Sequence, residues 1–276
     1  MALQVLCIGA HPDDCEGSVG GTIALFCRRG DRVKVISATE GSRGHYEPAY
    51  LENPDLLIDR RRAESLAAAR AGGYEFETLG FRDGDVYVDR DSTEAMVRAI
   101  RRAGEPGRGP DLVLMNRPSD YHRDHRYTAQ LVLDATYMLT VPFLCPDVPA
   151  IRRMPVFAYW QDGFTEYGEF RADVVVAIDE TIAVKREMML AHESQYLEWL
   201  PYNAEPGSAL YGLPEEEAPR RQAVAKALDR RSAQTAARHA DRLPEGTTYA
   251  EAFQISEYGR RPSSEELTTM FPTRLL

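Results

Sequence analysis

Short apolar runs alternate with amphipathic segments along the first half of the chain. The runs of strand length are residues 3–8, 33–37, 76–79 and 112–115. The segments with apolar side chains at helical spacing are residues 16–29, 58–71, 92–102 and 128–139. Strands that alternate with helices in this way predict βαβ units with right-handed crossovers. The expected fold class is therefore α/β, with a mainly parallel central sheet between two layers of helices.

The pattern becomes less regular after residue 140. Strands are expected over residues 156–160 and 174–178, helices over residues 181–199 and 215–242, and a loop over residues 201–214. The chain contains no internal repeat and no low-complexity tract. We therefore expect one α/β domain over residues 1–200, with residues 201–276 as a helical and loop extension that packs on the same domain.

Composition narrows the classes of partner. The formal net charge is −10, and an acidic surface repels the phosphates of nucleic acids and the headgroups of anionic membranes. No apolar run approaches the length of a membrane span, and no basic segment precedes the first strand. The four cysteines match no zinc-finger or redox spacing. These features predict a cytoplasmic protein without disulfides that binds neither nucleic acid nor membrane.

Two polar segments follow predicted strands. His11-Pro12-Asp13-Asp14 comes directly after the first strand, and His122-Arg123-Asp124-His125 comes a few residues after the strand 112–115. The carboxyl ends of the strands in an open parallel sheet border one crevice, where ligands bind. The two segments are therefore expected to face each other across that crevice, with three imidazoles and three carboxylates between them.

Histidine and carboxylate side chains in this number are typical of a catalytic zinc site, in which water completes the coordination sphere. Such a metal lowers the pKa of bound water from about 15.7 to about 7 and polarises a carbonyl oxygen. Spare carboxylates and imidazoles would then transfer protons. Either segment alone is also typical of a turn or a helix cap, but their shared position at strand ends favours a metal site. The mixed nitrogen and oxygen donors also suit Fe²⁺ and other divalent ions.

The same residues resemble a known family. GAHPDDCEGSVGGT, which contains the first polar segment, and YHRDHRYTAQLV, which contains the second, are similar to the two signature motifs of the PIG-L/LmbE-like zinc N-deacetylases. AHESQ at residues 191–195 and YAEAF at residues 249–253 are supporting matches, so the resemblance spans most of the chain. It implies a Rossmann-like α/β sandwich, in agreement with the order of the predicted elements.

The resemblance also implies roles for individual residues. The zinc ligands would be His11, Asp14 and His125. Asp13 would be the general base that activates water, and His122 would stabilise the oxyanion and protonate the departing amine. Asp124 would be a carboxylate that orients an imidazole, as metal-bound histidine usually requires.

Two positions depart from the family pattern, and three arginines are expected to contact substrate. Arg123 stands where the second motif usually has proline, and Cys15 where many members have glutamate. Arg61 belongs to an Arg-x-x-Glu pattern that is common in the family, and this pattern favours a contact with substrate. The alternative is that Arg61 forms an ion pair on the face of a helix. Arg43 lies in a glycine-containing loop after the second strand, and Arg123 adds a cation beside the second motif.

Three functions are consistent with these residues. The preferred one is removal of an N-acetyl group from an N-acetylglucosamine-type amino sugar or glycoconjugate. Enzymes of this kind often associate into homo-oligomers, but the sequence does not fix the oligomeric state. In the second, the same metal site acts as another amidase or as a hydratase on an unsaturated dicarboxylic acid. The third is a non-catalytic Rossmann-like protein that binds a nucleotide, which the carboxylates at the first strand end disfavour because they repel phosphate.

Overall fold

A computed structural model describes residues 2–272. The strands are β1 (Gln4–Gly9), β2 (Arg32–Thr39), β3 (Glu75–Phe81), β4 (Leu112–Met115), β5 (Val156–Trp160), β6 (Val174–Ala177) and β7 (Ala250–Ile255). The longer helices are α1 (Asp14–Arg29), α3 (Pro54–Gly72), α4 (Arg90–Arg102), α5 (Arg123–Met138), α6 (Ile182–Ala191) and α8 (Glu217–Arg238). The shorter helices are α2 (Pro48–Glu52), α7 (Leu200–Tyr202) and α9 (Ser264–Met270), with a π-helix over Ser194–Trp199 and a 3₁₀ turn over Ala240–Arg242.

The strands form one seven-stranded sheet in the order β3-β2-β1-β4-β5-β7-β6. The first five strands in this order are parallel, whereas β7 is antiparallel to both of its neighbours, β5 and β6. The order of strands 3-2-1-4-5 is that of a doubly wound sheet, whose connections reverse direction between β1 and β4. The predicted fold class is confirmed, and the crevice expected at this reversal borders the carboxyl ends of β1 and β4.

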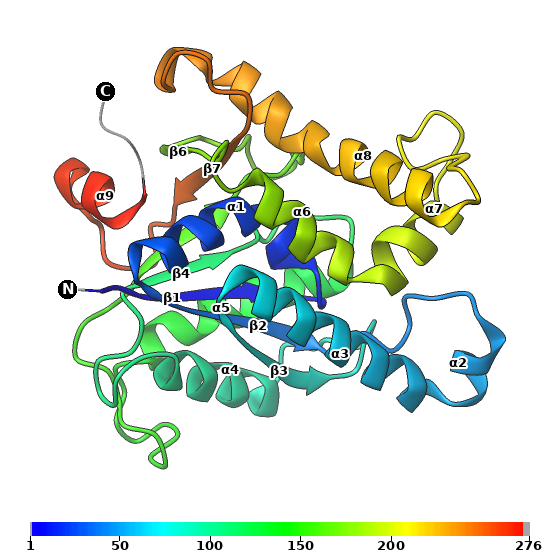
Figure 1. Ribbon diagram of the computed structural model, residues 1–276. Coiled ribbons are helices and arrows are strands. Elements are labelled where there is room, and N and C mark those ends of the chain that lie inside the picture. Colours follow the sequence, from blue (N-terminus) through cyan, green and yellow to red (C-terminus); the bar gives the residue numbers. More distant parts are fainter. Residues whose placement is uncertain (1, 273–276) are drawn as a thin grey trace.

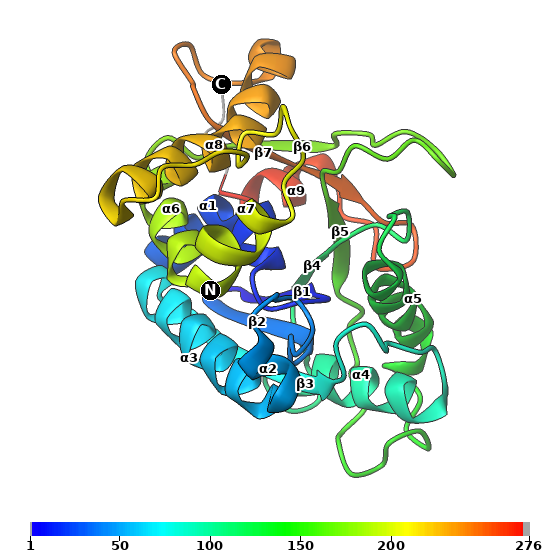
Figure 2. The same cartoon turned by 90° about the vertical axis from the view of Figure 1, so that its right-hand side faces the viewer.

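Helices cover both faces of the sheet, as Figures 1 and 2 show. Residues of β1 alternate between the faces because successive side chains of a strand point in opposite directions. Val5 and Cys7 belong to the buried cluster that contains α1, α3 and α6, whereas Leu6 and Ile8 belong to the cluster that contains α4 and α5. All of these β1 side chains are fully buried, so β1 is the centre of both halves of the core.

Several elements differ from the sequence-based expectation. The helix expected from residue 128 begins at Arg123, so the second polar segment forms its first turn. The helix expected over residues 181–199 is interrupted at His192 and continues as the π-helix. β7 was not expected as a strand, yet it pairs along the sheet between β5 and β6. We infer from this pairing that residues 201–272 belong to the same folding unit as residues 2–200.

Two further findings concern the described part of the chain. Among residues 2–272, no helix has the length and apolar character needed to cross a lipid bilayer. The four cysteines are free thiols: Cys7, Cys15 and Cys145 are buried and Cys27 is half-buried.

Candidate metal centre

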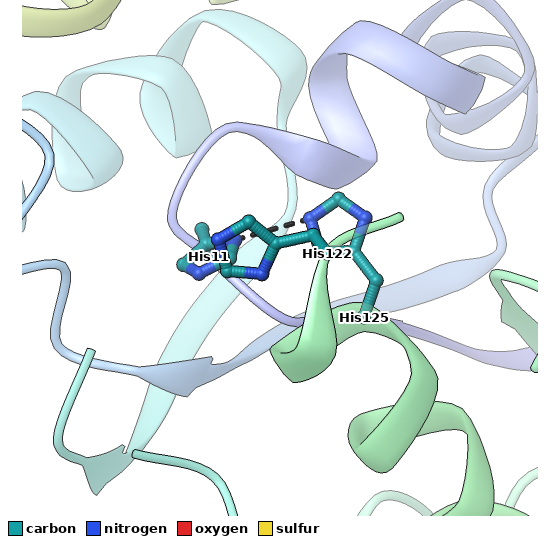
Figure 3. A group of neighbouring side chains, drawn as sticks. All are labelled: His11, His122 and His125. Atoms are coloured by element: carbon teal, nitrogen blue, oxygen red, sulfur yellow. Dashed lines mark hydrogen bonds between the residues drawn. The ribbon is translucent and has the colours of Figure 1, made fainter. Parts of the chain in front are cut away.

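The two polar segments lie side by side at the carboxyl ends of β1 and β4. β1 ends at Gly9, and α1 begins at Asp14, so His11 lies in the short turn between them. β4 ends at Met115, and His122 is the N-cap of α5. Because β1 and β4 are neighbouring parallel strands, these two connections meet. Figure 3 shows His11, His122 and His125 converging, with a dashed line between His11 and His125.

The three predicted ligands bring their donor atoms together. His11 Nδ1 is 3.1 Å from His125 Nε2 and 3.8 Å from Asp14 Oδ2, and His125 Nε2 is 3.5 Å from Asp14 Oδ1. Ligand atoms about 2.0–2.1 Å from a tetrahedral zinc ion are about 3.3 Å apart. The 3.1 Å between the imidazole nitrogens of His11 and His125 fits that spacing, whereas Asp14 approaches His11 with one carboxylate oxygen and His125 with the other. His122 also contributes a ring nitrogen to a group of three imidazoles whose ligand atoms lie within 4.8 Å of one another.

Carboxylates behind these imidazoles fix the ring orientations. His125 Nδ1 is 3.0 Å from Asp120 Oδ2, which leaves Nε2 directed towards His11. His11 Nε2 is 3.3 Å from Asp83 Oδ1 and 3.4 Å from Asp124 Oδ2. A metal-bound histidine usually donates its second N–H to such a carboxylate. Both rings therefore present one nitrogen to the centre and have the other paired.

The electrostatics of the centre favour a cation. Burial lowers the pKa of His11, but hydrogen bonds to Asp124 and Asp83 and the charge of Asp14 raise it to about 10. Burial raises the pKa of Asp14, but the positive charges of His125 and His11 and two backbone N–H donors lower it overall. Positive charge is thus stabilised where the donor atoms meet, which is the field that a divalent ion requires.

Asp13 is held apart from the donor atoms. Its backbone is left-handed, with φ 112° and ψ −21°, which is uncommon for a residue other than glycine. Arg61 is only 2% exposed, and its Nη2 lies 2.6 Å from the carbonyl oxygen of Pro12 and 3.3 Å from Asp13 Oδ2. Burial, followed in size by the opposing charge of Arg61 and the like charge of Asp14, leaves the pKa of Asp13 raised to about 6. A carboxylate with this pKa can accept a proton near neutral pH.

His122 presents its outer nitrogen as a hydrogen-bond donor. Its Nδ1 accepts a hydrogen bond from the backbone N–H of Asp124 at 3.2 Å. Burial and the neighbouring rings of His11 and His125 lower the pKa of His122, so the neutral form is favoured. A neutral imidazole that accepts at Nδ1 carries its proton on Nε2. That N–H can stabilise negative charge on a substrate oxygen.

The structure pairs the three predicted substrate-binding arginines with acidic residues. Arg43 Nη2 is 2.9 Å from Asp85 Oδ2, and Arg123 Nη2 is 3.5 Å from Asp85 Oδ1. Arg123 also lies over the ring of Tyr87, 4.7 Å from its centroid. With Arg61 held against Asp13, each of these cations has a carboxylate partner.

Sequence reasoning missed Asp83 and Asp120. Asp83 follows β3, a third parallel strand of the sheet, and the rule that selected His11 and His122 would have pointed to it too. Asp120 precedes the second motif by two residues, and no local pattern distinguishes it from an ordinary loop aspartate. Its pairing with His125 depends on how the turn before α5 folds back.

The fold and the centre together define a doubly wound α/β protein with a histidine–carboxylate cluster at its topological switch point. The model of one protein family, described as GlcNAc-PI de-N-acetylase (PIG-L), matches residues 6–136. The matched segment contains both polar segments and the strands that carry them.

Individual proteins are similar as well. Diacetylchitobiose deacetylase from Thermococcus kodakarensis is 29% identical over 208 residues, which covers 72% of this chain and 74% of the relative. 4-Oxalmesaconate hydratase from Pseudomonas putida is 26% identical over 179 residues, covering 63% and 67% respectively. The solved structure of N,N'-diacetylchitobiose deacetylase from Pyrococcus horikoshii superposes with a TM-score of 0.70 at 20% identity, covering 92% of this chain and 84% of that one. These comparisons support the resemblance to the PIG-L/LmbE-like N-deacetylases that the two motifs indicate.

Proposed function

We propose that this protein is a zinc-dependent hydrolase that removes the N-acetyl group from an N-acetylglucosamine-type amino sugar or glycoconjugate and releases acetate. The observation that carries the proposal is the convergence of His11, Asp14 and His125. The two imidazole nitrogens are 3.1 Å apart, and the two Asp14 oxygens lie 3.8 Å from His11 and 3.5 Å from His125. Similarity to a diacetylchitobiose deacetylase supports the choice of substrate class.

The residues divide into those that hold the ion and those that move protons. His11, Asp14 and His125 would hold zinc, which when bound lowers the pKa of water and polarises the amide carbonyl. Asp13 would accept the proton of the attacking water, since its carboxylate is the basic group next to the ligand Asp14. Arg61 orients that carboxylate through its contact at 3.3 Å.

His122 would act on the opposite side of the reacting carbonyl. Its Nε2–H would donate to the developing oxyanion, as the tautomer set by the Asp124 backbone N–H requires. The departing amine then needs a proton, which Asp13 or His122 would supply. Water attack and amide cleavage together yield acetate and the free amino sugar, so that atoms and protons balance.

Acetate release tests the proposal. Zinc-loaded protein is incubated with N-acetylglucosamine and with N,N'-diacetylchitobiose, and acetate is measured enzymatically. The variants Asp13→Asn and His122→Ala should each lose about 10²–10⁴-fold in turnover, the usual contribution of general acid–base catalysis. Asp55→Asn, on the exposed start of α3, is the matched control and should keep wild-type turnover. Absence of acetate from every acetylated sugar would contradict the proposal.

A hydratase is the second candidate because one relative is a hydratase of an unsaturated carboxylic acid. In that reaction the same ligands would hold the ion, and Asp13 would again accept a proton from water. The discriminating measurement is loss of ultraviolet absorbance when the conjugated acid takes up water. Hydration without acetate release would favour this candidate over the deacetylase.

A further inference from the structure

The arginines predicted to contact substrate are already paired, but Arg231 in α8 has no partner. Within residues 2–272, its guanidinium makes neither a hydrogen bond nor an ion pair. Its side chain is nevertheless exposed to water. The N–H donors of Arg231 are therefore free to bind a ligand, whereas Arg43, Arg61 and Arg123 already contact acidic residues.

The position of Arg231 on its helix is unusual for an exposed residue. It lies seven residues after Val224 and four before Thr235, both buried, so it shares the inward face of α8 with them. Residues on an inward face are normally covered by the layer beneath. Because Arg231 is inward and still exposed, the layer beneath α8 leaves its side chain uncovered at this turn, and this uncovered space is called the recess.

The neighbours of Arg231 place this recess at the crevice. One turn later, Thr235 Oγ1 is 3.2 Å from Gln161 Oε1, directly after the carboxyl end of β5. One turn earlier, Leu228 packs against the buried cluster that contains Tyr196. Figures 1 and 2 show α8 crossing the α1 and α6 side of the molecule. Arg231 thus lies between Tyr196 and the end of β5.

Tyr196 adds a second free donor. Its hydroxyl lies over the first turn of α1, where a Cβ placed on Gly17 would be 2.7 Å from Oη. The residue is 7% exposed, yet its hydroxyl makes no hydrogen bond within the described chain. The hydroxyl oxygen itself reaches solvent, so it is free to donate a hydrogen bond to a ligand.

We propose that Arg231 and Tyr196 form a subsite for an anionic group, a carboxylate or a phosphate, on the substrate bound at the metal centre. The inference rests on the proposed function and narrows it to acetylated amino sugars that carry such a group. Arginine binds both groups with paired, charge-assisted hydrogen bonds. The subsite also gives the C-terminal segment, through α8, a part in substrate recognition.

The carboxylates nearest to Arg231 in electrostatic effect are Asp162, Glu251 and Asp14. Glu251 is already paired with Lys185 at 2.6 Å. These acidic groups act on the guanidinium from a distance and contact other residues instead. Asp162, for example, pairs with Arg117 at 2.5 Å. An anion that enters the recess would restore direct contacts to the guanidinium.

Binding without turnover tests the subsite. Zinc-loaded full-length protein is titrated by calorimetry with glucosamine, glucosamine 6-phosphate and muramic acid, which supply no anion, a phosphate and a carboxylate. At least one anionic sugar should bind about tenfold more tightly than glucosamine, as a hydrogen bond to a charged group implies. The sugar with the larger preference identifies the group.

Three variants assign the preference to the subsite. Arg231→Gln should abolish the preference, so that the anionic sugar and glucosamine bind about equally tightly. Tyr196→Phe should weaken the preference by a smaller factor. Arg230→Gln, the neighbouring exposed arginine on the same helix, should retain it. Thermal midpoints of all variants confirm folding.

Two results would overturn the inference. One is equal affinity for all three sugars in the wild-type protein. The other is a preference that survives Arg231→Gln, which would show that the metal ion itself holds the anion. Because no product is measured, a protein that binds as expected but releases no acetate would refute the deacetylase function and leave the subsite standing.

Discussion

Replacing Glu251 by glutamine is expected to destabilise the folded protein by about 3–5 kcal/mol, the usual cost of removing one partner from a buried ion pair. Glu251 lies on β7 and is 4% exposed. Its carboxylate accepts hydrogen bonds from Lys185 Nζ at 2.6 Å, from the backbone N–H groups of Gly21 and Thr22 at 3.0 and 2.8 Å, and from Thr22 Oγ1 at 2.6 Å.

The backbone donors are free because α1 is interrupted. Val19 has φ −137° and ψ 19°, which are not helical, so the helix effectively starts again after it. The new first turn exposes N–H groups that have no partner in the helix. Glu251 satisfies two of them from 230 and 229 residues away, and its negative charge suits a helix N-terminus.

The expected magnitude follows from these contacts. A glutamine amide cannot neutralise Lys185, which is 2% exposed and whose ammonium, within residues 2–272, has only Ser232 Oγ, at 3.3 Å, as another hydrogen-bond partner. Its NH₂ group would also face either the ammonium or a backbone donor, leaving one of them unsatisfied at a cost of about 1–3 kcal/mol. The lost charge pairing between Glu251 and Lys185 accounts for the rest of the expected destabilisation of about 3–5 kcal/mol.

Urea unfolding followed by circular dichroism measures the change. The double variant Lys185→Met with Glu251→Gln separates the pair from the helix contacts, because it should cost less than the sum of the two single variants. Glu257→Gln, an exposed residue shortly after β7, is the control and should shift the free energy of unfolding by no more than about 0.5 kcal/mol.

The reasoning is refuted if Glu251→Gln costs less than about 1 kcal/mol, well below the value expected for a buried pair. It is also refuted if the two single costs are additive, since residues in direct contact are expected to couple.

Three further predictions concern other parts of the molecule. Asp120→Asn should weaken zinc binding about 10–100-fold in a chelator competition, because the carboxylate that orients His125 is lost; unchanged affinity would contradict that role. Arg101→Met should destabilise the protein by about 3 kcal/mol or more in urea unfolding, since this buried guanidinium donates only to backbone carbonyls around residues 138–148. Burial, the charge of Glu16 and its hydrogen bond raise the pKa of Tyr74 in the folded state. The stability from this group is therefore complete below its ordinary pKa of about 10 and is lost as pH rises above it; unfolding midpoints from pH 8 to 11 should fall less steeply for Tyr74→Phe than for the wild type.

The strands and helices of the first half were predictable because their signal is local. β1 and β4 are continuous apolar runs, which is what a strand buried on both faces requires. The two polar segments were predictable as partners because parallel strands end at one edge of a sheet. Their convergence in Figure 3 needed no knowledge of side-chain packing.

The C-terminal half was less predictable because its elements depend on distant partners. β7 carries the charged Glu251 in a buried position, which a hydropathy pattern does not identify as part of a central strand. The GGT at the end of the first motif and the supporting motif YAEAF resembled functional signatures, yet here they meet in the hydrogen bonds of Glu251 with Gly21 and Thr22. A sequence separation of about 230 residues lies beyond any local pattern.

The amino-acid sequence by itself determined the α/β fold and indicated a crevice bordered by the two polar segments. The tertiary structure decided how charges pair there. Arg43, Arg61 and Arg123 all appear available in the sequence, but folding places Asp85 or Asp13 beside each of them. Within residues 2–272, Arg231 on α8 remains unpaired. Hydrophobic periodicity is a property of neighbouring residues, whereas the pairing of charges depends on distances that exist only after the chain has folded.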